Sequence, residues 1–187
     1  MSGLHVYFGG TFDPPHLGHH RMLEALLADA WVGRVHLVPT GRNPLKVTDG
    51  SLGDRRLRKQ WLDLWLKELP RERLTLETLE IDNEEQGPQY TVDTLSTLKA
   101  REGGEWVLCF GADIVKDLPR WKNVRELLAK LHSVWVFGRG DSADPLGGLD
   151  PELRRMAEFR VMSPRIPDIS STLVRSLLKG DNALQKI

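Results

Sequence analysis

The chain has a single cysteine, Cys109, among 187 residues, and no net charge, with 26 basic and 26 acidic side chains. One cysteine excludes a disulfide within the chain and is typical of a reducing compartment. The charge balance argues against a general nucleic-acid or membrane binder. The sequence also lacks a leader-like basic and apolar start and any apolar run of membrane-spanning length. We therefore expect a cytoplasmic protein; the composition leaves the oligomeric state open, a homo-oligomer included.

Short apolar runs alternate with helical patterns along nearly the whole chain. This length predicts one domain, residues 1–187, with a substantial core. The expected strands are 4–8, 35–38, part of 75–81, 106–110, 134–137 and 161–162. The expected helices are 17–30, one from 51–54 onward, 91–102, 123–131, one from 150 onward and one from 170–171 onward. Such alternation predicts an α/β fold, a Rossmann-like doubly wound parallel sheet with helices on both faces.

Two stretches also predict which side chains turn toward the core. After Asp54, helical spacing predicts a buried face made of Leu57, Trp61, Leu64, Trp65 and Leu69. Between residues 75 and 81, apolar and polar residues alternate as in a half-buried strand. That alternation predicts inward positions for Leu76, Leu79 and Ile81.

The densest run of unusual residues follows the first expected strand. It reads Gly-Gly-Thr-Phe-Asp-Pro-Pro-His-Leu-Gly-His, residues 9–19. Two glycines permit a sharp turn and let a ligand approach the backbone, and the next helix begins with unpaired N–H groups at its positive end. His16 and His19 point to one helical face. This combination suits a polyphosphate; the alternative, a zinc site, lacks further ligands nearby at a familiar spacing.

This run resembles the phosphate-binding motif of nucleotidyltransferases with the HxGH signature, and its full form is most similar to the nicotinate mononucleotide adenylyltransferase family. The resemblance implies transfer of the adenylyl group of ATP to nicotinate mononucleotide, which gives nicotinate adenine dinucleotide and pyrophosphate. It implies catalytic roles for His16, His19 and Lys46, and phosphate binding by Gly9, Gly10, Thr11 and Phe12. Mg²⁺ would come with ATP, held by phosphate oxygens and water rather than by a protein metal site.

A second cluster follows the expected strand 106–110. Gly111-Ala112-Asp113 and, further on, Leu-Pro-Arg-Trp at 118–121 resemble the family's GADxxxxLPxW signature. The resemblance implies that Gly111 and Asp113 meet the nucleotides and that Trp121 stacks on the pyridine ring. An indole face suits a flat, electron-poor ring. The plainer alternatives are a core tryptophan for Trp121 and a helix cap for Asp113.

Two further segments complete the resemblance. Tyr90 and Thr91 belong to a PxYT-like segment, which implies contact with the mononucleotide beside the pyridine carboxylate; Thr91 also suits an ordinary helix cap. Residues 169–175, Ile-Ser-Ser-Thr-Leu-Val-Arg, resemble the family's ISSTxxR motif. This motif implies phosphate binding by Ser170, Ser171, Thr172 and Arg175. Arg139, just after an expected strand, matches a family arginine that also reaches phosphates.

The chain departs from the family pattern in the loop after the second strand. The family has a PPHK-like segment there, and this chain has Asn-Pro-Leu-Lys at 43–46, so the histidine is replaced by Leu45. The exchange removes one hydrogen bond to phosphate. We expect Arg42 to supply a donor instead; the alternative is that Leu45 only packs beneath the loop. Two other functions stay open: adenylyl transfer to nicotinamide mononucleotide or phosphopantetheine, and nucleotide-binding regulation with weakened catalysis.

Overall fold

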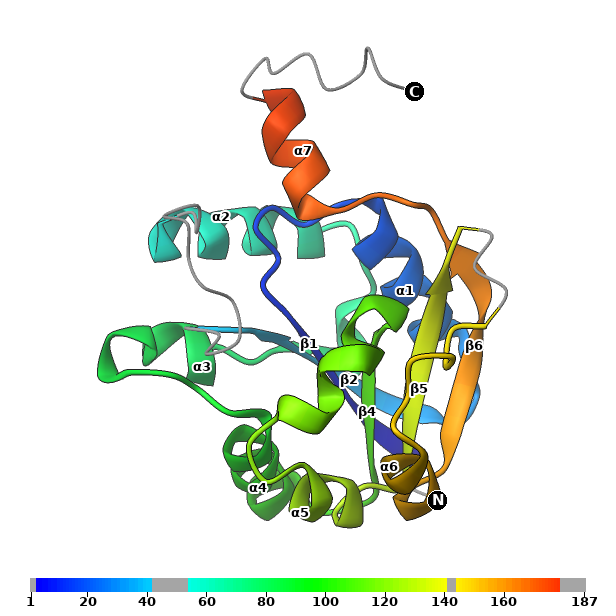
Figure 1. Ribbon diagram of the computed structural model, residues 1–187. Coiled ribbons are helices and arrows are strands. Elements are labelled where there is room, and N and C mark those ends of the chain that lie inside the picture. The colour runs from blue at the N-terminus through cyan, green and yellow to red at the C-terminus, as the bar shows by residue number, and fades with distance from the viewer. Residues whose placement is uncertain (1–2, 42–53, 141–143, 179–187) are drawn as a thin grey trace.

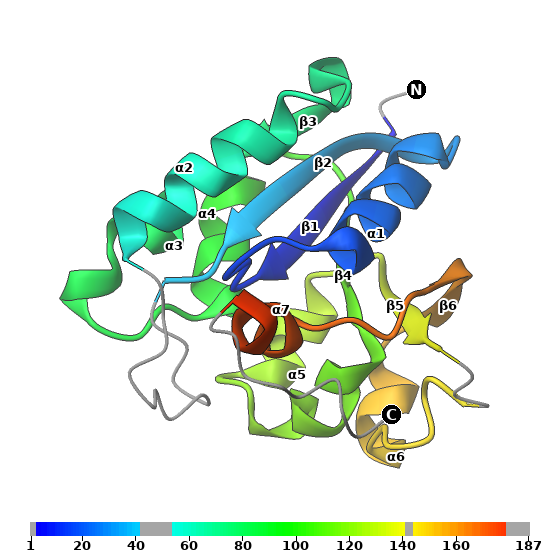
Figure 2. The same cartoon turned by 90° about the horizontal axis from the view of Figure 1, so that it is seen from above.

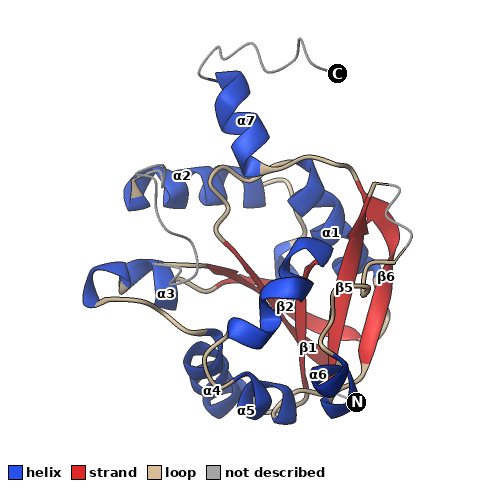
Figure 3. Ribbon diagram, viewed as in Figure 1, coloured by secondary structure: helices blue, strands red, loops and turns tan. Residues whose placement is uncertain are grey.

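The computed structural model describes residues 3–41, 54–140 and 144–178. Their strands form one six-stranded sheet in the order β3-β2-β1-β4-β5-β6, and neighbouring strands pair in parallel (Figure 3). The strands are β1 Leu4–Gly10, β2 Val32–Pro39, β3 Leu74–Leu76, β4 Trp106–Gly111, β5 Ser133–Arg139 and β6 Phe159–Ile166. This order is that of a doubly wound α/β sheet, so the predicted fold class is confirmed.

Helices cover both faces of the sheet (Figure 1). The α-helices are α1 Leu17–Ala28, α2 Arg55–Leu66, α3 Leu79–Asp82, α4 Thr91–Glu102, α5 Val124–Ala129, α6 Pro151–Met156 and α7 Ser171–Leu178. The described residues also form the 3₁₀ segments η1 Arg71–Arg73, η2 Glu84–Gln86 and η3 Ala112–Arg120. Within the described ranges, no helix has the length and apolar character needed to cross a bilayer.

The pleat of β1 divides its side chains between two cores. Phe8 belongs to the core beneath α1 and α2, which also contains Leu23 and Leu62. Tyr7 belongs to the core beneath α4 and α5, which also contains Leu95 and Leu127. Each face of the sheet is therefore covered by its own helices. The ends of the strands remain accessible to a ligand.

The order of the strands switches direction at β1. The chain passes outward from β1 through β2 to β3, and then returns to the other side of β1 with β4. The connections that leave β1 and β4 therefore diverge, which opens a crevice at the carboxyl ends of these two strands. Figure 2 shows α7, the last described helix, beside the carboxyl end of β1.

The predicted buried face after Asp54 is confirmed in part: Leu69 is buried and Trp65 packs against the core, but α2 is rotated from the predicted orientation. Arg58, Leu62 and Leu66 are buried, whereas Leu57 and Leu64 are 40% and 60% exposed. Sequence spacing favoured the apolar side chains for the core. An arginine occupies this face because its guanidinium group finds backbone carbonyl partners there.

The strand predicted in part of residues 75–81 is confirmed, but it is short. β3 ends at Leu76, and residues Leu79–Asp82 form α3, although Ile81 is buried as predicted. The Glu77 N–H still donates to the Leu37 carbonyl at 2.8 Å. The neighbouring strand β2 ends at a proline, which has no N–H for a further ladder bond. Without that partner the chain turns into a helix.

Candidate functional site

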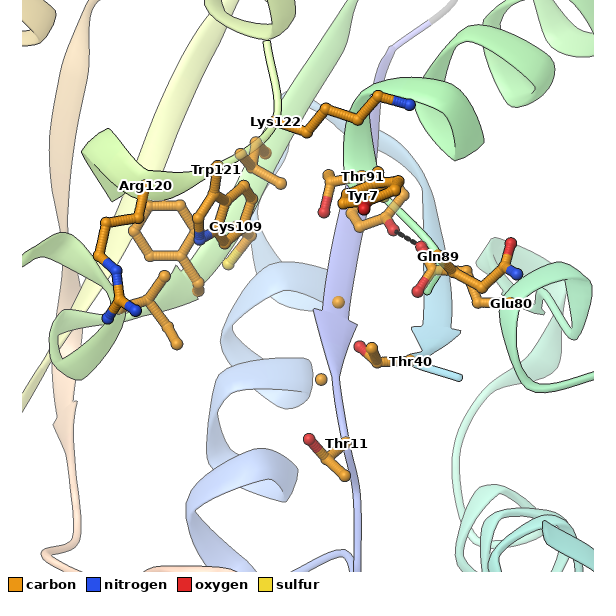
Figure 4. A pocket seen from close by; sticks show the side chains of 16 residues that line it. Tyr7, Thr11, Thr40, Glu80, Gln89, Thr91, Cys109, Arg120, Trp121 and Lys122 are labelled. Atoms are coloured by element: carbon orange, nitrogen blue, oxygen red, sulfur yellow. Dashed lines mark hydrogen bonds between the residues drawn. The ribbon is translucent and has the colours of Figure 1, made fainter. Parts of the chain in front are cut away.

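A cavity of about 390 Å³ lies at the carboxyl ends of β1 and β4. Its lining includes Gly9, Gly10 and Thr11 of the glycine turn, and Tyr90, Thr91 and Trp121 of the expected mononucleotide site (Figure 4). These segments lie far apart in the sequence, and the strand switch brings them to one place. The described structure therefore joins the first motif to two of the later ones.

Trp121 and Thr91 stand at the edge of this cavity. Trp121 follows η3 and is half-buried; its ring lies 6.0 Å from that of Phe110, and it lines the cavity while it also packs against the core beneath α4 and α5. Thr91 is the first residue of α4, and Tyr90 is the residue before the helix, so the expectation that Thr91 is the cap is wrong. The start of α4 nevertheless offers amides to the cavity.

His16 and His19 are brought together at the start of α1. Their rings stack with centroids 3.7 Å apart, and the His16 backbone N–H donates to His19 Nδ1 at 3.3 Å. A neutral His19 that accepts at Nδ1 carries its proton on Nε2. No group of three or more potential metal ligands occurs among the described residues.

His16 is held neutral by its surroundings. Burial and, to a smaller extent, the positive charge of Arg139 together lower the pKa of His16 to about 4, whereas the Asp113 carboxylate acts in the opposite direction. Within the described ranges, His16 Nδ1 and Arg139 Nε are buried and have no hydrogen-bond partner. Buried polar atoms of this kind are rare in proteins. Both atoms suit an anion that would supply acceptor oxygens.

Asp113 contacts Arg139 rather than capping a helix. Gly111 is the residue that precedes η3, so the cap alternative for Asp113 is wrong. Arg139 Nη2 lies 3.5 Å from Asp113 Oδ1. A Cβ on Gly111 would lie 2.7 Å from the same oxygen, so a larger residue there would require the Asp113 carboxylate to move. The second motif and the last residue of β5, Arg139, are therefore close together at the strand ends.

The last motif docks on the first. Ser171 Oγ donates to the Pro14 carbonyl at 2.9 Å, and the Arg175 guanidinium binds the Asp13 carbonyl. Ser170 Oγ accepts from the Leu173 N–H at 3.2 Å, which identifies Ser170 as the cap of α7. The N-termini of two helices, α1 and α7, thus meet over the same turn.

The remaining members of these two motifs have different positions. Arg175 also contacts the Thr172 hydroxyl at 3.2 Å, so both residues are engaged with protein groups. Phe12 is 1% exposed, and its ring packs edge-on against that of His19 at 4.8 Å, so its side chain belongs to the core and not to the cavity. Lys46, with Arg42 and Leu45, lies outside the described residues.

The HxGH run and the segment that leads into α7 pack closely against each other at Gly18. A Cβ on Gly18 would lie 3.0 Å from His16 Cε1 and 3.3 Å from Ile169 Cγ2. The glycine of the HxGH run therefore leaves room for the His16 ring on one side. On its other side it accepts the segment that leads into α7.

Arg58 is a part of the site that sequence reasoning missed. Its guanidinium donates to the Thr11 carbonyl at 2.9 and 3.2 Å and also to the Thr40 carbonyl. Thr11 and Thr40 follow β1 and β2, and both line the cavity. Arg58 therefore holds two walls of the cavity together. The signal in the sequence was an arginine at a position between apolar helix residues.

A buried carboxyl group is the second feature that was missed. Glu80 and Tyr7 line the cavity and contact each other through a hydrogen bond of 2.6 Å. Burial raises the pKa of Glu80, in opposition to hydrogen bonds from Tyr7 and Thr94. No pattern in the sequence pointed to this pair, because Glu80 reaches the cavity only through the short helix α3.

Comparison with known proteins gives consistent results. A family model described as cytidylyltransferase-like matches residues 7–177. A probable nicotinate-nucleotide adenylyltransferase from Leptospira interrogans is 30% identical over 176 residues, which are 92% of this chain and 84% of the relative. The nicotinate-nucleotide adenylyltransferase of Bacillus subtilis is 35% identical with the same coverage of both chains.

Solved structures show the same fold. The Plasmodium falciparum nicotinic acid mononucleotide adenylyltransferase complexed with NaAD has a TM-score of 0.77 and 18% sequence identity, with 99% of this chain and 88% of that chain covered. Its complex with APC has a TM-score of 0.74 at 19% identity, with 95% and 84% covered. From the family model and the curated relatives, the chain belongs to the cytidylyltransferase-like family and, within it, to the nicotinate-nucleotide adenylyltransferases.

Proposed function

We infer that the chain transfers the adenylyl group of ATP to nicotinate mononucleotide, which gives nicotinate adenine dinucleotide and pyrophosphate, a step of NAD biosynthesis. The observation that carries this conclusion is the shared cavity: the glycine turn, Thr91 and Trp121 line one space at the end of β1. Curated relatives over most of the chain are named for this activity. The cavity has room for a nucleotide and few charges in its wall.

The reaction needs no protein nucleophile. An oxygen of the mononucleotide 5′-phosphate attacks the α-phosphorus of ATP in line and forms a new P–O bond. The bond from that phosphorus to the oxygen that bridges the α- and β-phosphates breaks, and pyrophosphate leaves with the electron pair. The protein then contributes through position and through hydrogen-bond donors aimed at the phosphates.

We propose that the phosphates lie where α1, β5 and α7 meet. A neutral His19 that accepts at Nδ1 carries its proton on Nε2, and within the described ranges the buried His16 Nδ1 and Arg139 Nε have no hydrogen-bond partner. An oxygen that bears developing charge would accept from all three groups. Lys46 is proposed to add a further positive charge. Arg175 holds the turn at Asp13 and is proposed to reach a phosphate as well.

The groups at this place are compatible with Mg²⁺ that is bound by ATP rather than by protein side chains. The described residues contain no cluster of three or more carboxylate, histidine or cysteine side chains that could hold a metal. The groups around His16 are mainly hydrogen-bond donors, and such groups bind phosphate oxygens rather than a cation. Magnesium bound to the triphosphate would neutralise charge that develops on the leaving pyrophosphate. Asp113 is the carboxylate beside this place that could orient its water ligands.

We propose that the pyridine ring lies against Trp121, with its carboxylate toward the start of α4. Trp121 offers an indole face and Thr91 begins a helix of 12 residues, whose amides favour a negative charge. This arrangement supports nicotinate over nicotinamide. We also propose that residues 1–187 act as one nucleotidyltransferase domain, because both motif clusters contribute to a single site.

The direct test is pyrophosphate release. The full chain is mixed with ATP and Mg²⁺ and with nicotinate mononucleotide, nicotinamide mononucleotide or phosphopantetheine, and a reaction without acceptor measures ATP hydrolysis. We expect the fastest release with nicotinate mononucleotide. Release with phosphopantetheine alone would assign a different acceptor. Binding of ATP without release in any reaction would support a regulatory nucleotide-binding role instead.

A further inference from the structure

Lys122 follows Trp121 at the edge of the cavity, and the proposed chemistry leaves it without a role. Its Nζ donates to Asp93 Oδ2 at 2.9 Å and lies 4.4 Å from the centre of the Tyr90 ring. Asp93 and Tyr90 belong to the start of α4, toward which the pyridine carboxylate is proposed to point. Figure 4 shows the Lys122 side chain extended from the side of Trp121 toward α4.

Trp121 lies between η3 and α5 rather than within a strand or an α-helix. Its backbone N–H donates to the Leu118 carbonyl at 3.1 Å, which is a local contact within the preceding turn. Two residues later, Asn123 has a φ of 49°, a backbone conformation that residues with a side chain adopt rarely. The Phe110 ring supports the indole from β4. The position of the indole relative to α4 therefore depends on side-chain contacts.

The start of α4 provides two partners for the Lys122 ammonium. Asp93 lies in the first turn of the helix, where the helix dipole favours a carboxylate. Tyr90 precedes the helix, and its ring face attracts a cation. The hydrogen bond to Asp93 raises the pKa of Lys122, so the ammonium stays charged at neutral pH. Lys122 is therefore bound to the same helix turn that begins with Thr91.

Neighbouring cations make different contacts. Arg120 also lines the cavity, but it lies 3.4 Å from Asp117 within its own segment, η3. Lys130 Nζ donates to Ser96 Oγ at 2.9 Å, farther along α4 and away from the cavity lining. That contact fixes α5 against the middle of α4. Lys122 instead connects the two segments at the end of α4 that faces the cavity.

We propose that Lys122 is a positioning residue that holds the Trp121 indole at a fixed distance from the start of α4, so that the pyridine ring enters a gap of set width. This proposal rests on the proposed function, because it places the pyridine end of the mononucleotide between Trp121 and Thr91. The ammonium is already engaged by Asp93 and the Tyr90 ring, so it acts through the walls of the gap. Its effect is therefore the same for a pyridine carboxylate and for a pyridine carboxamide.

The test is steady-state kinetics of the full chain with Lys122→Met, which removes the charge and keeps an apolar side chain of similar length. We expect KM for nicotinate mononucleotide and KM for nicotinamide mononucleotide to rise by the same factor, about fivefold, the scale of an exposed ion pair together with a cation–π contact. The kcat and the KM for ATP should change little. Lys122→Arg keeps the charge, so its KM values should stay close to those of the wild type.

Asp93→Asn tests the partner of this contact. It should raise KM for both mononucleotides, and the double variant Lys122→Met/Asp93→Asn should be no worse than Lys122→Met alone, because both changes remove the same contact. Direct binding of the pyridine carboxylate by Lys122 predicts the opposite result for Asp93→Asn. A nearby negative charge would then be lost, and KM for nicotinate mononucleotide would fall.

Lys59→Met is the matched control. Lys59 pairs with Asp82 at 2.7 Å, and its side chain is 38% exposed, compared with 42% for Lys122. Neither Lys59 nor Asp82 lines the cavity. The KM values of this variant should stay at the wild-type level. Thermal unfolding of each variant checks that it is folded.

The outcomes separate this proposal from the proposed function. Wild-type KM values in Lys122→Met overturn the proposal, and so does a rise confined to nicotinate mononucleotide, which would make Lys122 a direct ligand of the carboxylate. An equal rise in KM for ATP also overturns it, because the effect is then not specific to the pyridine side. A wild-type chain without turnover contradicts the proposed function instead. Calorimetric dissociation constants of the two mononucleotides then decide the role of Lys122, and a wild-type chain that binds neither of them overturns both proposals.

Discussion

The rings of His16 and His19 stack face to face, with centroids 3.7 Å apart, at the first turn of α1. This contact fixes the direction of both imidazoles, because the His16 backbone N–H also binds His19 Nδ1. A ligand at this place therefore meets donors that are oriented before it arrives. An enzyme without a nucleophile of its own accelerates its reaction mainly through donors that are preorganised in this way.

Removal of either imidazole should impair the reaction. We expect His16→Ala or His19→Ala to lower kcat by about a hundredfold, the scale of losing one donor to developing charge. His20→Ala on the same helix is the control, because His20 contacts Trp65 and Glu24 instead. Steady-state kinetics checks the expectation, and an unchanged kcat in both alanine variants would remove the pair from the mechanism.

Gly18→Ala should disturb the His16 ring without harming the helix. A new Cβ would lie 3.0 Å from His16 Cε1, closer than ordinary contact, whereas alanine favours a helix by about 1 kcal/mol over glycine. We expect kcat to fall by about tenfold or more while the helix content seen by circular dichroism stays the same. Gly148→Ala is the control, since a Cβ there would make an ordinary 3.5 Å contact. Equal kcat in the two variants would contradict this prediction.

Arg58→Lys should weaken the cavity walls. A lysine cannot bind the Thr11 and Thr40 carbonyls together as the guanidinium does, and a buried carbonyl that loses its donor costs about 1–3 kcal/mol. We expect a loss of that size in the free energy of unfolding, measured in urea. The exposed Arg56→Lys is the matched control on the same helix. A full retention of stability in Arg58→Lys would show that these carbonyls do not depend on Arg58.

Trp121→Ala should act on one substrate only. Stacking of an aromatic side chain on a flat ring contributes about 1–3 kcal/mol, so KM for the mononucleotide should rise by about tenfold or more. KM for ATP should change little, and Trp121→Phe should keep much of the affinity. Trp31→Ala, at a side chain that is 71% exposed, is the control. Equal increases in both KM values would argue against a stacking role.

Local pattern was enough to predict most of the fold. Apolar runs such as residues 106–110 and the spacing of leucines in 91–102 depend on neighbours in the sequence, and the structure confirms them as β4 and α4. The motif at residues 9–19 likewise carries its own turn and helix start. These features are predictable because their cause lies within a few residues.

The parts that were missed depend on distant partners. Arg58 is buried because the Thr11 and Thr40 carbonyls, which are distant in the sequence, accept hydrogen bonds from it. The periodicity of the helix cannot reveal these partners. Glu80 became a cavity residue because β2 ends at Pro39 and the chain turns into α3. The roles of His16, Trp121 and their neighbours in binding and catalysis stay predictions until they are measured.

The contact between α7 and the first turn has a consequence for synthesis on the ribosome. Ser171 and Arg175 bind carbonyls of Pro14 and Asp13, which lie 157 and 162 residues earlier. The growing chain can pair β1 with β2 early, because these strands are neighbours in sequence. The proposed phosphate end of the site is completed only when residue 175 has emerged. We therefore expect a nascent chain to build much of its sheet before it can bind ATP productively, and a product that stops before α7 to be inactive.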